Sequence, residues 1–285
     1  MATQLKDTRI TQSLPQGSVS WPLPPRVRPE FADHDKATLE SYLASAPLDE
    51  VDIADPLWWE TDTNHVYFRR LREEAPIFFT HVNSNRHRGF WNVTRWNDVM
   101  AVDTNHQVFS SEAMLGGITL FDMDSDFIMP MFIAMDPPQH TAQRRTVAPA
   151  FGPAEVERMR AETVARTAAV LDSLPLNTPF DWVEKLSIEL TTQMLAILFD
   201  FPFEERHKLT RWSDVLGDIE SFGTLEQRQH RLATAFEMGA AFKQLWDKKA
   251  QNPGQHDLIS VMLQSDAMKH MSHEEFMGNL ILLIV

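Results

Sequence analysis

Residues 135–151 read MDPPQHTAQRRTVAPAF, the most basic short stretch of an otherwise acidic chain. Asp136 is a residue type that caps helices and Pro137 suits a first helical turn, so a helix is predicted to begin there. Pro149 predicts that this helix ends near Ala148, because proline cannot continue the backbone hydrogen bonds of a helix.

His140 and Arg144 are four residues apart, so they lie on one face of the predicted helix, and Val147 and Phe151 continue the same face. A guanidinium one turn from an imidazole suits a pair of carboxylates or phosphates. On spacing alone, a surface helix whose cations pair with acidic neighbours is the commoner explanation. Both explanations stay open here. Arg145 is expected to point to solvent.

Composition limits the remaining possibilities. The 285 residues carry 26 Lys and Arg against 40 Asp and Glu, a formal net charge of -14, so no nucleic-acid partner is expected and any anion site must be local. The chain has no cysteine, and therefore no disulfide or thiolate. No signal peptide or membrane span is evident from the sequence. We therefore expect a soluble, cytoplasmic protein.

Periodicity predicts a mainly α fold with a small β element. Residues 1–50, rich in Pro, Ser and Thr, are expected to form an extended N-terminal arm, and residues 51–285 one incomplete domain. That domain would comprise a β-hairpin region at about 64–110, with strands IFFTHV and GFWNVTR, a loop at about 111–134 and a helical body at 135–285.

The last fifteen residues, MSHEEFMGNLILLIV, open with a helix-capping pattern formed by Ser272 and Glu275. No Gly, basic turn or polar residue marks the end of this helix before the chain stops after Val285. We therefore expect the chain to be truncated within a core helix.

The string FIAMDPPQHTAQRRTVAPAF, preceded by VFSS and followed by PAEVERMRAETVARTAAVLDSL, resembles the helix C region of bacterial cytochrome P450 monooxygenases. The resemblance implies that His140 and Arg144 bind the propionates of heme b, with Phe151 and Ile133 beside the porphyrin. It extends over essentially the whole chain to NLILLIV, which is similar to the first half of the central helix I. The implied fold is the N-terminal two thirds of the cytochrome P450 fold.

Two further stretches, GGITLFDMDSDFIMPMFIAMDPP and SIELTTQMLAILFDFPFEERHKLTRWSD, are most similar to the group that hydroxylates the terminal carbon of alkanes and fatty acids. The resemblance implies an apolar substrate and electrons from a ferredoxin and its reductase. From its residues alone, the apolar loop at about 111–134 is equally well explained as an ordinary loop packed on the core or as the wall of a pocket. With the resemblance, the expected substrate pocket comprises Met114, Ile118, Leu120, Phe121, Met123, Phe132 and Leu283.

The chain also departs from the family. The resemblance implies an axial cysteine ligand, an acid-Thr pair later in helix I and a Glu-x-x-Arg pair in helix K, and this chain contains none of them. We therefore expect no catalytic residue within it. Its 11 histidines lack metal-ligand spacing, so no metal site of the protein's own is expected.

Two hypotheses follow. The first is a heme-dependent monooxygenase that hydroxylates a terminal C–H of medium-chain alkanes or fatty acids with O2 and two electrons, of which this chain is an inactive fragment. The second is a non-catalytic helical binding protein or an inactive remnant of a monooxygenase.

Overall fold

The computed structural model describes residues 31, 34–81, 89–115, 117–118, 120, 129–218, 224–252, 254 and 256–285. The chain divides into two compact units, one of residues 15–128 and one that contains residues 129–285. We call them the N-terminal unit and the C-terminal unit and describe each by itself. Within the described ranges the structure is helical apart from two strands, which confirms the predicted fold class.

In the described part of the N-terminal unit, α1 (Lys36–Ser45), α2 (Pro56–Glu60) and α3 (Asn64–Glu74) contribute buried residues to a small core, and α4 (Trp96–Asp103) contributes none. The expectation of an extended arm is wrong for residues 36–45. Asp35 accepts a hydrogen bond from the Thr38 N–H at 2.8 Å and caps α1, and Leu39 and Leu43, one turn apart, are both buried.

Strands β1 (Ile77–His81) and β2 (Gly89–Val93) form an antiparallel pair in which Phe79 lies opposite Trp91, so the predicted hairpin is confirmed. The predicted turn between them lies outside the described residues. Phe78 and Phe90 pack against the core of this unit. The rings of Phe79 and Trp91 meet edge to face, with 5.2 Å between their centroids.

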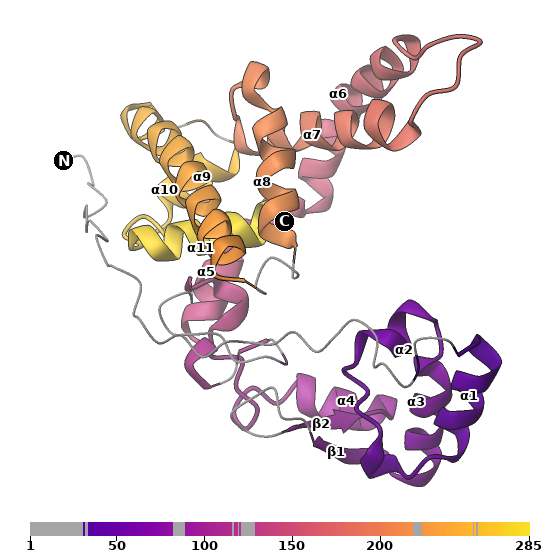
Figure 1. Ribbon diagram of the computed structural model, residues 1–285. Helices are drawn as coiled ribbons and strands as arrows, with labels where there is room; N and C mark the ends of the chain where they lie inside the picture. Colours follow the sequence, from indigo (N-terminus) through magenta and orange to yellow (C-terminus); the bar gives the residue numbers. More distant parts are fainter. Residues whose placement is uncertain are drawn as a thin grey trace. The chain divides into compact units, whose positions relative to one another are not determined.

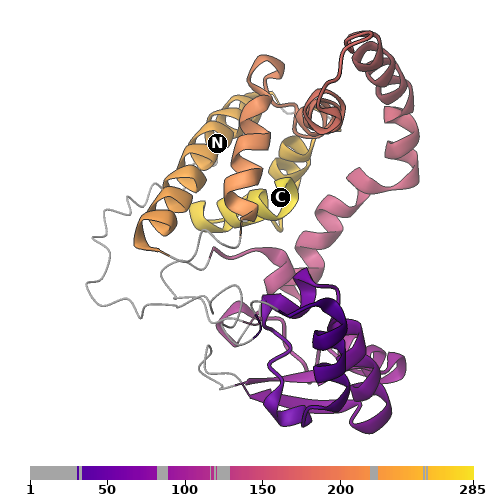
Figure 2. The same cartoon turned by 45° about the vertical axis from the view of Figure 1, so that its right-hand side comes forward.

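The C-terminal unit confirms the predicted helical body. Helices α8, α9 and α11 lie together in both Figure 1 and Figure 2. Their buried contacts include Trp212, Phe242, Trp246, Phe276 and Leu280. None of the helices within the described ranges is long and apolar enough to cross a membrane. The helices of this unit are α5 (Gln139–Val147), α6 (Pro153–Asp172), α7 (Glu189–Phe199), α8 (His207–Gly217), α9 (Leu225–Gln251), α10 (Leu258–Gln264) and α11 (His273–Ile284).

Short helical turns join several of these helices. The turns that matter for the site are η5 (Phe132–Ala134), before α5, and η6 (Ala148–Phe151), directly after it. A π-helical turn, η7 (Val183–Ile188), leads into α7, and η8 (Phe203–Glu205) precedes α8. Helix α11 begins as predicted, since the Ser272 hydroxyl accepts from the Glu275 N–H at 3.1 Å.

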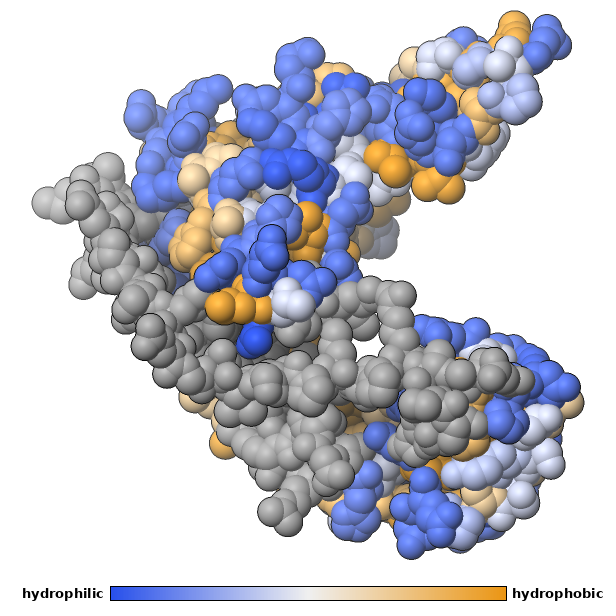
Figure 3. All heavy atoms as spheres, viewed as in Figure 1, coloured by the Kyte–Doolittle hydropathy of each residue, from blue (hydrophilic) through white to orange (hydrophobic). Residues whose placement is uncertain are grey.

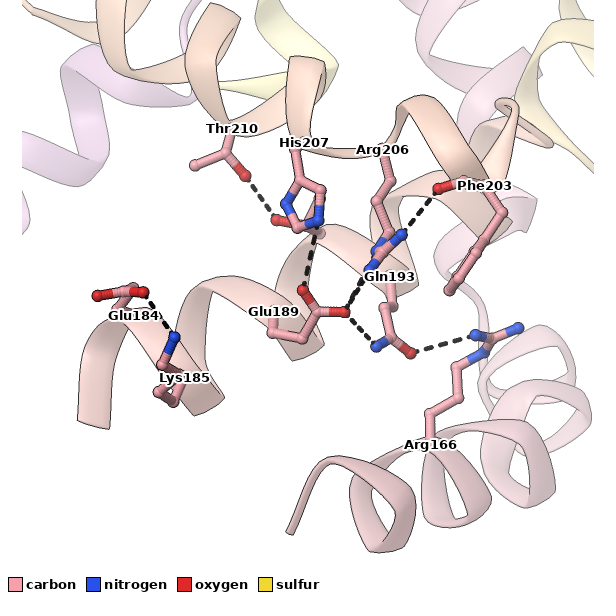
Figure 4. Close-up of polar contacts among 10 residues, drawn as sticks. Arg166, Glu184, Lys185, Glu189, Gln193, Phe203, Arg206, His207 and Thr210 are labelled. Atoms are coloured by element: carbon pink, nitrogen blue, oxygen red, sulfur yellow. Dashed lines mark hydrogen bonds and ion pairs between the residues drawn. The ribbon is translucent and has the colours of Figure 1, made fainter. Parts of the chain in front are cut away.

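A polar cluster joins α6, α7 and α8 (Figure 4). Glu189 accepts hydrogen bonds from Arg206 Nη2 at 2.9 Å and Gln193 Nε2 at 2.6 Å, and Gln193 Oε1 accepts from Arg166 at 3.1 Å. The guanidinium carbons of Arg166 and Arg206 lie 4.8 Å and 4.4 Å from the ring centroid of Phe203. Burial alone would raise the pKa of Glu189, but the bonds from Gln193 and Arg206 outweigh it and the pKa is lowered.

Apolar side chains also lie at the surface of the segment that runs from α6 to the start of α7. Figure 3 shows hydrophobic residues there among hydrophilic ones. Val164, Leu176, Trp182 and Val183 are all exposed. The buried core of this unit therefore lies in the bundle of α7 to α11 rather than along the outer face of α6.

Candidate cofactor-binding site

Helix α5 carries His140 and Arg144, the two predicted propionate-binding residues, which we call the clamp. The helix starts later than expected. Its first residue is Gln139, its N-cap is Pro138, and no side chain caps it. The prediction that the Asp136 side chain caps the helix is therefore wrong. A cap at Asp136 would accept from the amide of the second or third helical residue, and Pro138 in the second position has no N–H. The Asp136 backbone carbonyl accepts from the His140 N–H at 3.1 Å.

The predicted end of the helix is confirmed. Helix α5 stops at Val147, and the 3-10 turn η6, with Pro149 in its first turn, follows at once. His140 and Arg144 therefore both lie in regular helix, one turn apart on one face.

The imidazole of His140 is held by the segment that leads into α5. Its Nδ1 atom lies 2.7 Å from the backbone carbonyl oxygen of Phe132, and the Phe132 ring is tilted against it at 6.2 Å between centroids. A carbonyl oxygen can only accept, so Nδ1 carries the hydrogen in this contact. The other ring nitrogen, Nε2, has no partner within the described residues, and it donates to an anionic ligand when it also carries a hydrogen.

Arg144 is exposed, and its guanidinium has no hydrogen-bond or ion-pair partner within the described part of the chain. The same holds for Arg145, the next residue. Six other arginines within the described residues do pair with acidic neighbours, at helical spacing or across helices. Those pairs are Arg70 with Glu74, Arg158 with Glu155, Arg160 with Glu157, Arg166 with Glu162, Arg206 with Glu189 and Arg211 with Glu237.

The explanation of α5 as a surface helix with internally paired cations therefore does not describe Arg144. When both nitrogens of the His140 ring carry hydrogen, Nε2–H and the guanidinium N–H groups of Arg144, one turn away, form a donor set for two carboxylates. The residues present fit the two propionates of a heme in their chemistry.

Apolar side chains lie beside this donor set. Phe151 and Ile133 remain accessible, with exposed fractions of 52% and 39%. Val147, which continues the helix face of His140 and Arg144, is buried in the core of the C-terminal unit instead. An apolar cofactor surface next to the clamp would therefore meet Phe151 and Ile133 rather than Val147.

A buried polar network, which the sequence did not predict, joins α11 to Phe132, before α5, and to Gln143, within α5. Asn279 Oδ1 accepts from the Phe132 N–H at 2.9 Å, and Asn279 Nδ2 donates to Gln143 Oε1 at 3.1 Å. Gln143 in turn donates to Glu275. Asn279 and Gln143 are only 0% and 1% exposed. The signal that could have revealed it is the single Asn within the apolar run GNLILLIV.

Gly278 brings the same helix into backbone contact with the segment before η5. A Cβ atom at this position would lie 2.1 Å from the carbonyl oxygen of Pro130 and 3.0 Å from that of Met129. Glycine is therefore required here for close approach, and Gly278 and Asn279 together fix residues 129–132 against α11.

The expected substrate-pocket residues fall into three groups. Met114, Ile118 and Leu120 belong to the N-terminal unit and are exposed at its surface. Phe132 and Leu283 belong to the C-terminal unit, where Phe132 is buried and Leu283 packs against the core. Phe121 and Met123 lie outside the described residues. The shared pocket therefore remains a prediction.

Among the residues that the structure describes, no group of three or more His, Asp or Glu side chains could hold a metal ion.

Two solved structures are similar to most of this chain. The structure titled cytochrome P450-153 from Novosphingobium aromaticivorans is 45% identical, with a TM-score of 0.71, and the match covers 82% of this chain and 58% of that one. CYP153D17 from Sphingomonas sp. PAMC 26605 is 49% identical with a TM-score of 0.72, over 84% of this chain and 60% of that one.

Curated relatives are more distant. A linalool 8-monooxygenase of Pseudomonas putida is 26% identical over 249 residues, which are 84% of this chain and 60% of the relative. A steroid C26-monooxygenase of Mycobacterium tuberculosis (strain H37Rv) is 29% identical over 236 residues, 79% of this chain and 54% of the relative. No protein-family model matches the chain.

These curated relatives are monooxygenases by name, and a matched solved structure is a cytochrome P450. The chain belongs to the cytochrome P450 family. It spans little more than half the length of the curated relatives that it matches, 60% and 54% of the two named here.

Proposed function

We propose that this chain is part of a heme-dependent monooxygenase that inserts one atom of O2 into a terminal C–H of a medium-chain alkane or fatty acid. Identity of 45% and 49% to two solved cytochrome P450 structures supports the class of enzyme. The resemblance of residues 116–138 and 187–214 to alkane and fatty-acid hydroxylases supports the class of substrate.

The observation that carries the proposal is the donor set on α5. His140 keeps Nδ1 engaged with Phe132 and offers Nε2, and Arg144 offers an unpaired guanidinium one turn away. In the proposed site these two side chains bind the propionates of heme b. Phe151 and Ile133 lie against its apolar surface. Both roles keep the charged end of the cofactor at the helix and its apolar part away from water.

Bound heme would supply the chemistry of O2 activation, which needs an axial cysteine ligand in this family. The chain has no cysteine, so in this proposal the ligand comes from polypeptide outside these 285 residues. In this proposal the described residues of the C-terminal unit hold and orient the cofactor, and Phe132 and Leu283 of the same unit line the path of an apolar substrate.

Electrons would arrive from a ferredoxin and its reductase. Arg145 is exposed and unpaired within the described residues, next to the proposed clamp, so it is a candidate contact for an acidic electron donor. Unchanged electron-transfer kinetics in an Arg145→Glu variant would refute that contact.

The decisive experiment begins with the DNA that follows the Val285 codon. An open reading frame that supplies a cysteine-containing loop supports the monooxygenase. The complete product, reduced and exposed to carbon monoxide, should show the red-shifted absorption band of a thiolate-bound heme. Incubation with octane, octanoic acid and dodecanoic acid should then yield products hydroxylated at the terminal carbon.

A stop codon directly after Val285, with an intact mass equal to that of the 285 residues, would favour the second candidate, a non-catalytic helical binding protein or an inactive remnant. A thiolate-bound heme with hydroxylation only at internal carbons would keep the enzyme class and refute the proposed regiochemistry.

A further inference from the structure

Asn279 connects two structures that hold the proposed clamp. Through Oδ1 it accepts the Phe132 N–H, and the carbonyl of the same residue, Phe132, binds His140 Nδ1. Through Nδ2 it donates to Gln143, which directly precedes Arg144 on α5. One amide side chain therefore sets the position of the η5 backbone and of the helix that carries both cations.

Few side chains could make both of these hydrogen bonds. The side chain must accept from a backbone N–H with one atom and donate to a side-chain oxygen with the other, and only Asn and Gln offer a carbonyl and an NH2 group together. Asn279 is completely buried, so neither contact can be replaced by bulk water. Loss of the amide would leave the Phe132 N–H and Gln143 Oε1 without these partners.

By holding Phe132, Asn279 also affects which ring nitrogen of His140 carries the hydrogen. The contact of Nδ1 with the Phe132 carbonyl keeps a hydrogen on Nδ1, so in the neutral ligand-free ring Nε2 carries none. A carboxylate can only accept, so the ring that binds it carries a hydrogen on both nitrogens, with Nδ1–H on Phe132 and Nε2–H on the ligand. If Phe132 shifts, the preference for hydrogen on Nδ1 is lost, because a free imidazole can place its hydrogen on either nitrogen.

We infer that Asn279 is a positioning residue of the cofactor site, which holds Phe132, and through Phe132 the His140 ring, in the orientation that binds a porphyrin carboxylate. This inference rests on the proposed function for the identity of the ligand. The positioning of His140 itself does not depend on that identity.

The test compares the 285-residue chain with Asn279→Ala, which removes both contacts, and Asn279→Asp, which keeps an acceptor for the Phe132 N–H. The matched control is Thr192→Val, because Thr192 is also buried, at 3% exposure, and within the described residues its hydroxyl bonds to Thr210 on α8 and not to the clamp. Circular dichroism establishes that each variant is folded.

Two readouts are measured. Two-dimensional nitrogen NMR of the ligand-free chain reports the tautomer of His140. Absorbance titration gives the affinity for ferric protoporphyrin IX and for its dimethyl ester, in which the carboxylates are blocked.

We expect the ligand-free wild type to hold the Nδ1-protonated tautomer and to prefer the free acid over the ester. Asn279→Ala should mix the tautomers and lower the affinity for the free acid about tenfold. Asn279→Asp should restore the tautomer, and Thr192→Val should change neither readout. If Asn279→Ala does not fold, the test rests on Asn279→Asp. We then expect His140 in Asn279→Asp to hold the same tautomer as in Thr192→Val. Mixed tautomers in Asn279→Asp would overturn the inference.

The two possible failures are distinguishable. A wild type that binds acid and ester equally would refute the proposed propionate clamp, and the tautomer of His140 would then decide the positioning role alone. A wild type that prefers the acid, with an Asn279→Ala variant unchanged in tautomer and affinity, would refute the positioning role and leave the clamp standing.

Discussion

The Nδ1 atom of His140 lies 2.7 Å from the backbone carbonyl oxygen of Phe132, eight residues earlier in the chain. This contact ties the first turn of α5 to the turn η5 that precedes it. It occupies Nδ1 of the imidazole and leaves Nε2 available for a ligand. The available nitrogen and the unpaired guanidinium of Arg144 together define the proposed clamp.

Replacing His140 and Arg144 together with Ala should lower the affinity for ferric protoporphyrin IX by about 100-fold or more. Each residue would contribute one charge-assisted hydrogen bond of about 1.5–3 kcal/mol, and each 1.4 kcal/mol is about tenfold in affinity. Absorbance titration of the chain measures the effect. Arg145→Ala is the matched control, because it removes an exposed, unpaired cation from the same helix turn. Equal affinities in the double variant and the control would contradict the clamp.

Gly278→Ala should destabilise the C-terminal unit by about 2–3 kcal/mol, because a Cβ atom there would lie 2.1 Å from the Pro130 carbonyl oxygen, a backbone atom that cannot move alone. Gly239→Ala is the control. Its Cβ would lie 2.7 Å from Met277 Sδ, the flexible part of a side chain, so a cost below about 1 kcal/mol is expected.

Both substitutions place Ala in a helix and gain the same helix propensity, so their difference reports the contact alone. Urea denaturation followed by circular dichroism gives the two free energies of unfolding. Equal values would show that residues 129–130 do not pack tightly on α11.

Local patterns in the sequence were sufficient for most elements of the fold. Runs of β-favouring residues on either side of a polar turn predicted β1 and β2, and the Ser272 cap before an apolar run predicted α11. The N-terminal arm was mispredicted at α1 because its proline-rich flank dominated the composition, although Asp35 and the Leu39–Leu43 spacing carried a helix signal.

The clamp was only partly predictable. The spacing of His140 and Arg144 put them on one helix face, but whether Arg144 pairs with an acidic side chain depends on residues distant in sequence. The bonds from Asn279 to Phe132 and Gln143 span separations of 147 and 136 residues, which no local pattern can reveal. Asp136 likewise matches a capping residue type by itself, but Pro138 two residues later lacks the N–H that such a cap would use.

Lys249→Ala should cost about 3 kcal/mol of stability. Lys249 is buried in α9 and binds Asp200 at 2.7 Å and Asp257 at 3.0 Å, and its loss would leave the buried Asp257 carboxylate without its cation. Lys243→Ala is the control on the same helix, because Lys243 pairs with the exposed Asp247 and should cost less than about 1 kcal/mol. Thermal unfolding at pH 7 measures both. A cost for Lys249→Ala no larger than for Lys243→Ala would rule out a buried ion pair.

Glu189 should make the stability of the C-terminal unit depend on pH in the acid range. Its folded-state pKa is lowered from the ordinary value of 4.5, since hydrogen bonds from Gln193 and Arg206 outweigh the effect of burial. A lowered folded pKa contributes stability that is present above pH 4.5 and is lost as the pH falls through the folded value. His207 Nε2, 3.7 Å from Glu189 Oε2, adds a further favourable charge when protonated.

Glu189→Gln should therefore be less stable than the wild type by about 1–2 kcal/mol at pH 7, and the difference should close as the pH falls below about 4. Glu184→Gln is the control in the same polar region (Figure 4), because Glu184 forms an exposed pair with Lys185 that should contribute little. Urea denaturation from pH 7 to pH 3 measures the free energies. A constant difference across this range would mean that the Glu189 carboxylate does not supply the pH-dependent stability of the α6–α7–α8 cluster.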